Sequence, residues 1–210
     1  MLASAVVNHV AAALSTLVQC EPQATATILR LVSPDNTNRL TRACVVALMD
    51  AVLQLRSTST PLIFAGNQHF FSAGADFPEI AKLDGSTALE FSKLGQRLMH
   101  AITSHPAPTF AAIDGYCMGG GLDLALACRH RISSPHAIFG HRGAALGLIT
   151  GWGGTQRLPR LIGKSRALQM FLAAEKLHAA EALRIGLVDA VVGAPVAEAE
   201  KRLSAITGQS

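Results

Sequence analysis

Apolar residues in this chain occur either in short continuous runs or at the three-to-four-residue spacing of helices. Continuous or nearly continuous runs at Ala26–Val32, Pro61–Ala65 and Pro108–Ile113 predict strands. Thr41–Leu55 and Thr87–Ile102 carry apolar residues at helical spacing and predict helices. This alternation indicates an α/β fold with a largely parallel sheet.

The second half of the chain continues the same rhythm. Its expected strands are 131–133, 137–139 and 187–192, and its expected helices are 156–162, 165–173, 179–184 and 196–206. The segment 70–76 is expected to be a loop. The apolar segment 3–18 fits either a helix or two short strands; it lacks the basic start of a signal peptide, and its polar residues argue against a membrane span.

A triple glycine marks the junction between a predicted strand and the apolar helix-like run Leu122–Cys128. Gly119, Gly120 and Gly121 stand there in succession. Glycine lets main-chain N–H groups approach a ligand closely, and the first N–H groups of a helix are unpaired. The junction therefore suits a developing negative charge. Tight packing of the strand on the helix is the alternative explanation.

Composition narrows the class of protein. Half of the 210 residues are hydrophobic and 15% are charged, which suits a large buried core and argues against disorder. The net charge is +4, without a basic cluster interleaved with aromatic residues, so nucleic acid is not an expected partner. The four cysteines form no C-x-x-C pair and no histidines stand at metal-ligand spacing, so free buried thiols and no metal are expected.

Several motifs in order carry a family resemblance. They are Phe71–Asp76, Gly115–Asp123, Phe139-Gly140 followed by Leu146-Gly147-Leu148, Gly151–Leu158, and Glu181-Ala182 followed by Gly186-Leu187-Val188. From about residue 24 to about residue 193 the chain resembles the enoyl-CoA hydratase/isomerase (crotonase) superfamily. The resemblance implies a superhelix of repeated β-β-α units and activity on acyl-CoA thioesters.

The resemblance also implies a thioester site made of main-chain amides. The two N–H groups that hold the thioester oxygen in the family match Ala75 and Gly120. Substrate-binding positions match Ala73, Gly74, Asp76, Phe77, Gly119 and Gly143. Loss of one such donor costs on the order of 3 kcal/mol in the transition state.

The catalytic acids depart from the family pattern. Hydratases of the family use two glutamates on one water; the first matches Asp123, whereas the second falls on Gly143. With one acid missing, ordinary hydration is doubtful, and Asp123 is expected to move a proton alone. Three neighbours could assist: His141 as an acid or base, Arg142 as an ion-pair partner, and Trp152 as a wall of the acyl pocket. Packing or solvent-exposed roles are the alternatives for all three.

These observations lead to one expected function and one alternative. The expected function is a lyase or isomerase that acts on an acyl-CoA or acyl-carrier thioester through an enolate; the alternative is a non-catalytic acyl-CoA-binding homologue. No cofactor is expected apart from coenzyme A as part of the substrate. A cytoplasmic homo-oligomer is expected, either a trimer or a hexamer. The expected core covers residues 1–193. A short helical tail over 194–210 is expected in place of the family's longer C-terminal helical region.

Overall fold

The computed structural model describes residues 16–141 and 143–207, with only the backbone at residues 145 and 207. Arg142 and most of the 3–18 segment lie outside these residues, so the expectations for them are not addressed. Within the described part, no helix combines the length and the apolar character required to cross a bilayer.

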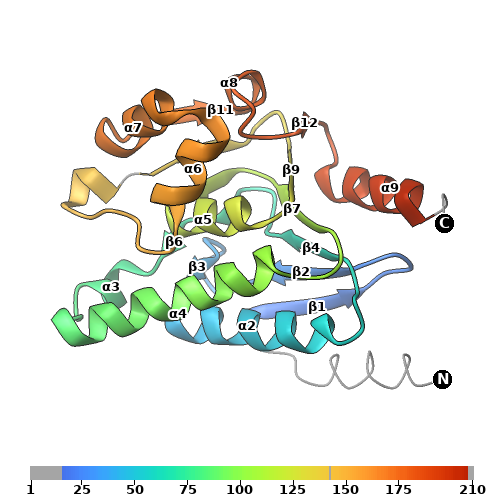
Figure 1. Cartoon of the computed structure of the whole chain (residues 1–210), viewed down its shortest axis with the longest axis horizontal. Helices are drawn as coiled ribbons and strands as arrows, with labels where there is room; N and C mark the ends of the chain where they lie inside the picture. Colours follow the sequence, from blue (N-terminus) through green and yellow to red (C-terminus); the bar gives the residue numbers. More distant parts are fainter. Residues whose placement is uncertain (1–15, 142, 208–210) are drawn as a thin grey trace.

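A six-stranded sheet runs through the molecule (Figure 1). Its neighbours are parallel except for the first pair. Its order is β1 (Val18–Pro22), β2 (Thr27–Leu31), β4 (Leu62–Ala65), β7 (Thr109–Ile113), β9 (His130–Ser133) and β12 (Ala190–Val191). The predicted α/β class and largely parallel sheet are confirmed.

A second sheet contributes Phe70, Tyr116, Met118 and Lys176 to the pocket described below. Its order is β11 (Lys176–His178), β10 (Ile138–Gly140), β8 (Tyr116–Met118) and β5 (Phe70–Ser72). A short parallel pair joins β3 (Arg39–Leu40) to β6 (Gly74–Ala75). The prediction of a loop over 70–76 was wrong, because main-chain pairing with β8 and β3 draws this segment into two short strands.

Helices surround the sheets. They are α2 (Arg42–Arg56), α3 (Phe77–Ile80), α4 (Gly85–Thr103), α5 (Gly120–Ala127), α6 (Gly154–Ile162), α7 (Lys164–Leu172), α8 (Ala179–Arg184) and α9 (Pro195–Thr207), with a 3-10 turn, η1, at Gly143–Leu146. Local chemistry fixes their starts: the Thr41 hydroxyl accepts a hydrogen bond from the Cys44 amide at the start of α2, and Asp84 with Thr87 forms a capping box on α4.

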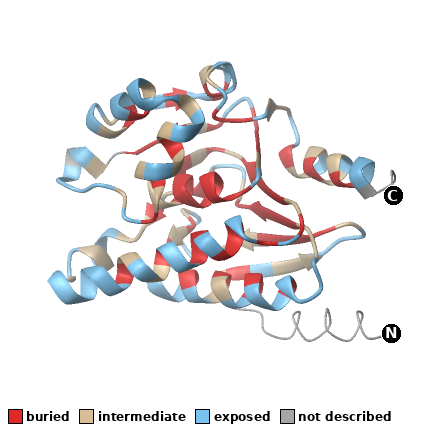
Figure 2. Ribbon diagram, in the orientation of Figure 1, coloured by how far each residue is buried: buried red, intermediate tan, exposed pale blue. Residues whose placement is uncertain are grey.

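Helix α5 lies at the centre of the molecule and is buried from Gly121 to Ala127 (Figure 2). Such a helix must be apolar on every side. Its Leu122, Leu124 and Leu126 join the main core, and Asp123 is the exception in the run. A buried carboxylate in an otherwise apolar helix is costly to ionise, which marks Asp123 for closer inspection.

The last helix packs on the far side of the six-stranded sheet. Ala199 and Leu203 of α9 are buried against a smaller core that includes Phe110 and Ile132. Before it, the buried Arg131 side chain donates hydrogen bonds to the carbonyl oxygens of Leu187 and Cys128, at 2.9 and 2.8 Å. These contacts join the chain after α8 to the sheet. The division of the chain at residue 193 stays a prediction.

Candidate active site

Each of the three glycines before and within α5 has a separate structural reason. Gly119 has φ +51°, a conformation that side-chain-bearing residues rarely adopt. A Cβ atom on Gly120 would lie 2.6 Å from the Trp152 ring, and one on Gly121 would lie 2.7 Å from the Ser72 Cβ atom. Tight packing therefore explains Gly121, while Gly119 and Gly120 shape the wall of a pocket.

The segment around Ala75 lies directly against this junction. A Cβ atom on Gly74 would be 3.2 Å from the Gly120 amide nitrogen, and one on Gly120 would be 3.4 Å from the Ala75 amide nitrogen. Two segments far apart in sequence thus bring their main chains together at one end of α5. As the first residue of that helix, Gly120 has an N–H group for which the helix itself supplies no acceptor.

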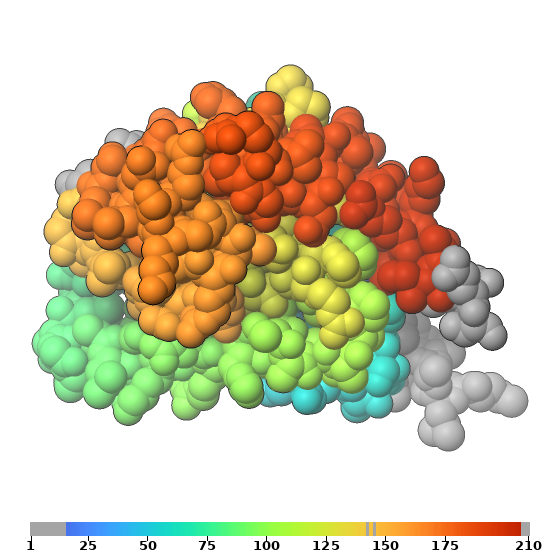
Figure 3. All heavy atoms as spheres, turned by 45° about the horizontal axis from the view of Figure 1, so that its top comes forward, coloured from blue at the N-terminus to red at the C-terminus, as the bar shows by residue number. Residues whose placement is uncertain are grey.

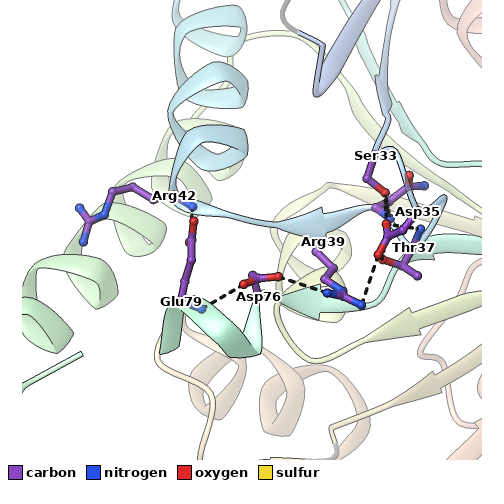
Figure 4. A network of polar contacts seen from close by, with 8 residues as sticks. Ser33, Asp35, Thr37, Arg39, Arg42, Asp76 and Glu79 are labelled. Atoms are coloured by element: carbon purple, nitrogen blue, oxygen red, sulfur yellow. Dashed lines mark hydrogen bonds and ion pairs between the residues drawn. The ribbon is translucent and has the colours of Figure 1, made fainter. Parts of the chain in front are cut away.

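A polar network fixes the Ala75 segment from outside (Figure 4). The Asp76 carboxylate accepts a hydrogen bond from the Glu79 amide at 3.0 Å and forms an ion pair with Arg39 at 3.4 Å. The Glu79 carboxylate in turn accepts from the Arg42 amide at 2.8 Å. Asp76 therefore caps α3 and does not line the pocket, so its predicted role in substrate binding could involve only its main chain.

The pocket itself has a volume of about 870 Å³ and a largely apolar wall. All the other predicted site residues within the described part of the chain line it: Ala73, Gly74, Ala75, Phe77, Gly119, Gly120, Asp123, His141, Gly143 and Trp152. Such a concave, mainly apolar cavity with few polar groups is typical of a small-molecule site. Asp123 is the only carboxylate among the described residues that line it.

Asp123 is almost completely buried, at 1% exposure. One carboxylate oxygen, Oδ2, accepts a hydrogen bond from the Thr150 hydroxyl. Burial raises the pKa of Asp123 from 3.8 to about 7; the Thr150 hydroxyl, the Arg157 charge and the Gly154 amide lower it by smaller amounts. The residue can therefore exist in either protonation state near neutral pH, as a general acid or base requires.

His141 faces the other oxygen of the same carboxylate. Its Nε2 atom lies 3.5 Å from Asp123 Oδ1, and neither atom has another hydrogen-bond partner among the described residues. Burial lowers the pKa of His141 from 6.5 to about 4. The Phe171 ring packs against the imidazole with 5.0 Å between ring centroids. His141 is thus a buried pocket residue, and the alternative of a surface histidine is wrong.

Gly143, where the family pattern has its second glutamate, has no space for a side chain in this conformation. A Cβ atom there would lie 2.6 Å from the Leu148 carbonyl oxygen. That spacing follows from a tight turn, because the Leu148 amide donates to the Gly143 carbonyl oxygen at 2.8 Å. The conformation of the 143–148 segment therefore requires glycine at position 143 and leaves no space there for a carboxylate side chain.

Trp152 fills the space between two helices. A Cβ atom on Gly95 of α4 would lie 2.2 Å from its Nε1 atom, and its ring makes an edge contact with Phe91 at 5.3 Å. The Gly151 carbonyl beside it accepts hydrogen bonds from Ser92 and Gln96 of α4, so the chain after residue 150 lies over that helix (Figure 3). Trp152 is both a core residue and a wall of the pocket.

Sequence reasoning missed two residues beside Asp123. Thr150 binds its carboxylate, and a Cβ atom on Gly154 would lie 2.1 Å from its Oδ1 atom. Thr150 precedes the Gly151–Leu158 motif and Gly154 lies within it, but nothing in the spacing of this stretch indicates that it folds back onto the first turn of α5. Lys176, on the far strand β11, also lines the pocket and was not foreseen.

The fold and pocket together define a class, and comparison with known proteins agrees. Residues 21–207 match the family model described as enoyl-CoA hydratase/isomerase, and the chain belongs to this family. Its structure has the crotonase fold: DspI from Pseudomonas aeruginosa superimposes with a TM-score of 0.89 at 33% identity, over 93% of this chain and 76% of DspI.

Two further relatives carry enzyme names. An enoyl-CoA hydratase from Bacillus anthracis superimposes with a TM-score of 0.86 at 30% identity, over 91% of this chain and 76% of that one. A crotonyl-CoA hydratase from Syntrophomonas wolfei is 37% identical over 168 residues, which are 79% of this chain. The matched part is 65% of the length of the Syntrophomonas protein.

Proposed function

We propose that this protein acts on an acyl-CoA or acyl-carrier thioester by forming an enolate. The thioester oxygen would accept hydrogen bonds from the amides of Ala75 and Gly120, and Asp123 would move a proton at the adjacent carbon. The observation that carries this proposal is the position of Gly120 and Asp123 on one turn of the buried helix α5, both on the wall of one pocket.

The chemistry follows from where charge develops. Removal of a proton from C2 sends the C–H electron pair into a C1–C2 double bond and the carbonyl π pair onto the thioester oxygen. Fixed N–H donors next to that oxygen stabilise the negative charge without reorganising at the moment of reaction. The positive end of the α5 dipole adds to this effect at Gly120.

A single carboxylate favours isomerisation or decarboxylation over ordinary hydration. Hydration by the family's route needs two carboxylates on one water, and Asp123 is the only one among the described pocket residues. Shifting a double bond, or protonating an enolate left by loss of CO₂, requires one group that carries a proton. The similarity to a crotonyl-CoA hydratase makes crotonyl-CoA the reference substrate against which these reactions are compared.

Non-catalytic binding of acyl-CoA is the second candidate. The observation that favours it is Gly143, where the turn closed by Leu148 has no space for a carboxylate. On this alternative the pocket binds the thioester, and Asp123 stays protonated and inert.

Turnover of crotonyl-CoA, a 3-enoyl-CoA and a malonyl-type CoA separates the two candidates. Exchange of C2 protons of butyryl-CoA in D₂O, followed by NMR, detects an enolate whichever reaction the enzyme completes. We expect exchange in the wild type and its loss in Asp123→Ala. Micromolar binding of the CoA esters with neither exchange nor turnover would establish the binding role instead.

The assembly and location belong to the same proposal. We expect a cytoplasmic homo-oligomer, a trimer or a hexamer. Large apolar side chains are exposed at the pocket, among them Phe77, Leu146 and Ile149, which is consistent with a contact that covers them. Light scattering coupled to size-exclusion chromatography measures the number of subunits.

A further inference from the structure

The two orphaned atoms that face each other in the pocket define a pair. Asp123 Oδ1 and His141 Nε2 are 3.5 Å apart, each buried and each without another hydrogen-bond partner among the described residues. An ionised carboxylate can only accept, and a neutral imidazole nitrogen without hydrogen can only accept. One proton held between them gives both atoms a partner, whereas no proton leaves both unsatisfied.

Among the described residues, Thr150 and the Gly154 amide also act on the Asp123 carboxylate. Thr150 occupies Oδ2 as a hydroxyl donor, so Oδ1 is the oxygen left for exchange. The Phe171 ring packs against the imidazole of His141. Both residues still line the pocket, so a substrate carbon can approach the carboxyl group.

The surroundings add few compensating charges. From α6, the Arg157 charge acts on Asp123, while its guanidinium donates to the Trp152 carbonyl oxygen at 3.2 Å. The Cys117 thiol comes from β8. Burial and, to a smaller extent, the Asp123 carboxylate raise the pKa of this thiol well above 9.0. Lys176 of β11 lines the pocket, and its ammonium lies over the Tyr116 ring. A lone carboxylate in this apolar wall is therefore costly.

We propose that His141 is the second proton-carrying group of the site, and that it exchanges one proton with Asp123 so that the carboxylate can act as a base without leaving a net charge in the pocket. This rests on the proposed enolate chemistry. On this proposal His141, which directly follows Phe139-Gly140, takes the role that the family pattern assigns to a carboxylate at Gly143.

The protons balance when the site converts a 3-enoyl thioester to a 2-enoyl thioester. Before reaction the shared proton is on Asp123, because the pKa of Asp123 is about 7 and that of His141 is about 4. Once this proton has moved to His141, the Asp123 carboxylate takes a proton from C2, and the C–H pair becomes part of a dienolate. The site then carries one positive charge on the pair and one negative charge on the dienolate. The Asp123 carboxyl returns its proton to C4, the double bond moves to C2–C3, and the shared proton remains on the pair.

The test compares His141→Gln with a matched control, His105→Gln. Gln retains hydrogen bonding but cannot titrate. His105 is also a buried histidine, but it lies outside the pocket and its Nε2 atom is 2.8 Å from the Thr60 carbonyl oxygen. We expect His141→Gln to lower kcat/KM and the C2 exchange rate by about 100-fold, the lower end of general acid–base effects. We expect the control to stay near the wild-type rate.

The pH profile separates a proton carrier from a packing residue. The singly protonated pair predicts a wild-type rate that falls on both the acid and the alkaline side. In His141→Gln the alkaline fall should disappear, leaving a rate that rises as Asp123 ionises. An unchanged profile with a rate within about threefold of the wild type would overturn the role of His141 while leaving the proposed function intact.

An NMR titration of the wild type tests the pair without relying on turnover or on a variant that folds. The chemical shifts of the His141 ring nitrogens and of the Asp123 carboxyl carbon should change together as the pH is varied, because the two groups share a proton. Independent titration of the two signals would refute the proposal. If the wild type shows coupled titration but no C2 exchange, that result would instead count against the proposed function alone.

Discussion

The two ends of the first turn of α5 are built from different kinds of atoms. The end at Gly120 consists of main chain, with β6 pressed against the helix start, whereas the end at Asp123 consists of side chains supplied by α5, by the residue after β10 and by the loop before α6. Main-chain groups depend on glycines that allow a close approach, so they leave a clear sequence pattern. Side-chain groups leave no such pattern, and on our proposal His141 takes the role that the family pattern assigns to a carboxylate at Gly143.

The largest expected effect comes from removing the carboxylate. Asp123→Asn retains the size of the side chain but cannot carry the proton, so kcat/KM and C2 exchange should fall by about 1000-fold. Binding of a CoA ester should stay within about threefold, because the main-chain end is unchanged. Asp50→Asn, on the surface of α2, is the control. Equal loss of binding would mean that the two ends are not separable.

Gly154→Ala tests the side-chain end without touching its chemistry. The new Cβ atom would start 2.1 Å from Asp123 Oδ1 and must displace the carboxylate. A shift of about 1 Å at a reacting group lowers the rate by about 100-fold. In the control, Gly151→Ala, the Cβ atom would contact the Ser92 side chain, whose hydroxyl oxygen lies 3.0 Å away. Matching rates in the two variants would show that the position of Asp123 is not critical.

Gly95→Ala tests the main-chain end from α4, at a residue that does not itself line the pocket. Its Cβ atom would lie 2.2 Å from Trp152, and Trp152 in turn packs on Gly120. Overpacking of this kind costs about 1–3 kcal/mol. Trp152→Phe should recover part of the loss in a double-mutant cycle measured by urea unfolding. The control is Gly85→Ala at the start of α4, where nothing lies within 4 Å; additive losses would rule out the contact.

The smallest effect concerns stability as a function of pH. The raised pKa of Asp123, about 7 against 3.8, makes the folded state bind more protons than the unfolded state, so its contribution falls as pH rises between these values. The lowered pKa of His141, about 4 against 6.5, makes its contribution rise with pH between those values. The two slopes oppose each other in the wild type.

Single variants should expose each slope in urea denaturation between pH 4 and pH 7. Asp123→Asn should make the slope of stability against pH more positive than in the wild type, because the opposing carboxyl contribution is removed. His141→Gln should make the slope more negative than in the wild type, because the opposing histidine contribution is removed. Other groups with lowered pKa values, such as His105 and His130, are present in both variants, so they cancel in this comparison with the wild type. Slopes that match the wild type in both variants would contradict the two pKa shifts.

Sequence patterns predicted the regular elements because burial dictates them. The apolar runs gave β2, β4, β7 and the long helices to within a few residues. The short strands β5, β8 and β11 were missed, since each has three residues and is held by pairing with distant strands rather than by its own pattern. β1 was obscured by the undecided apolar segment before it.

The site divides in the same way. Residues near Ala75 and Gly120 were found because their glycines follow strands in a recognisable order. Thr150 and Gly154 were not, because their proximity to Asp123 depends on the path of the chain after residue 141. His141 was named as a candidate, but the spacing of its segment does not indicate that it is buried against Asp123.

The placement of Gly120 and Asp123 three residues apart in α5 has a consequence for attempts to redesign the enzyme. A helix rises about 1.5 Å per residue, so the separation along its axis between the amide and the carboxyl-bearing residue is set at about 4.5 Å. Substitutions within α5 cannot retune that separation without unwinding a fully buried element. New substrate preferences should therefore arise in the 143–152 loop, whose exposed leucines and isoleucine leave room for variation while the reacting geometry stays constant.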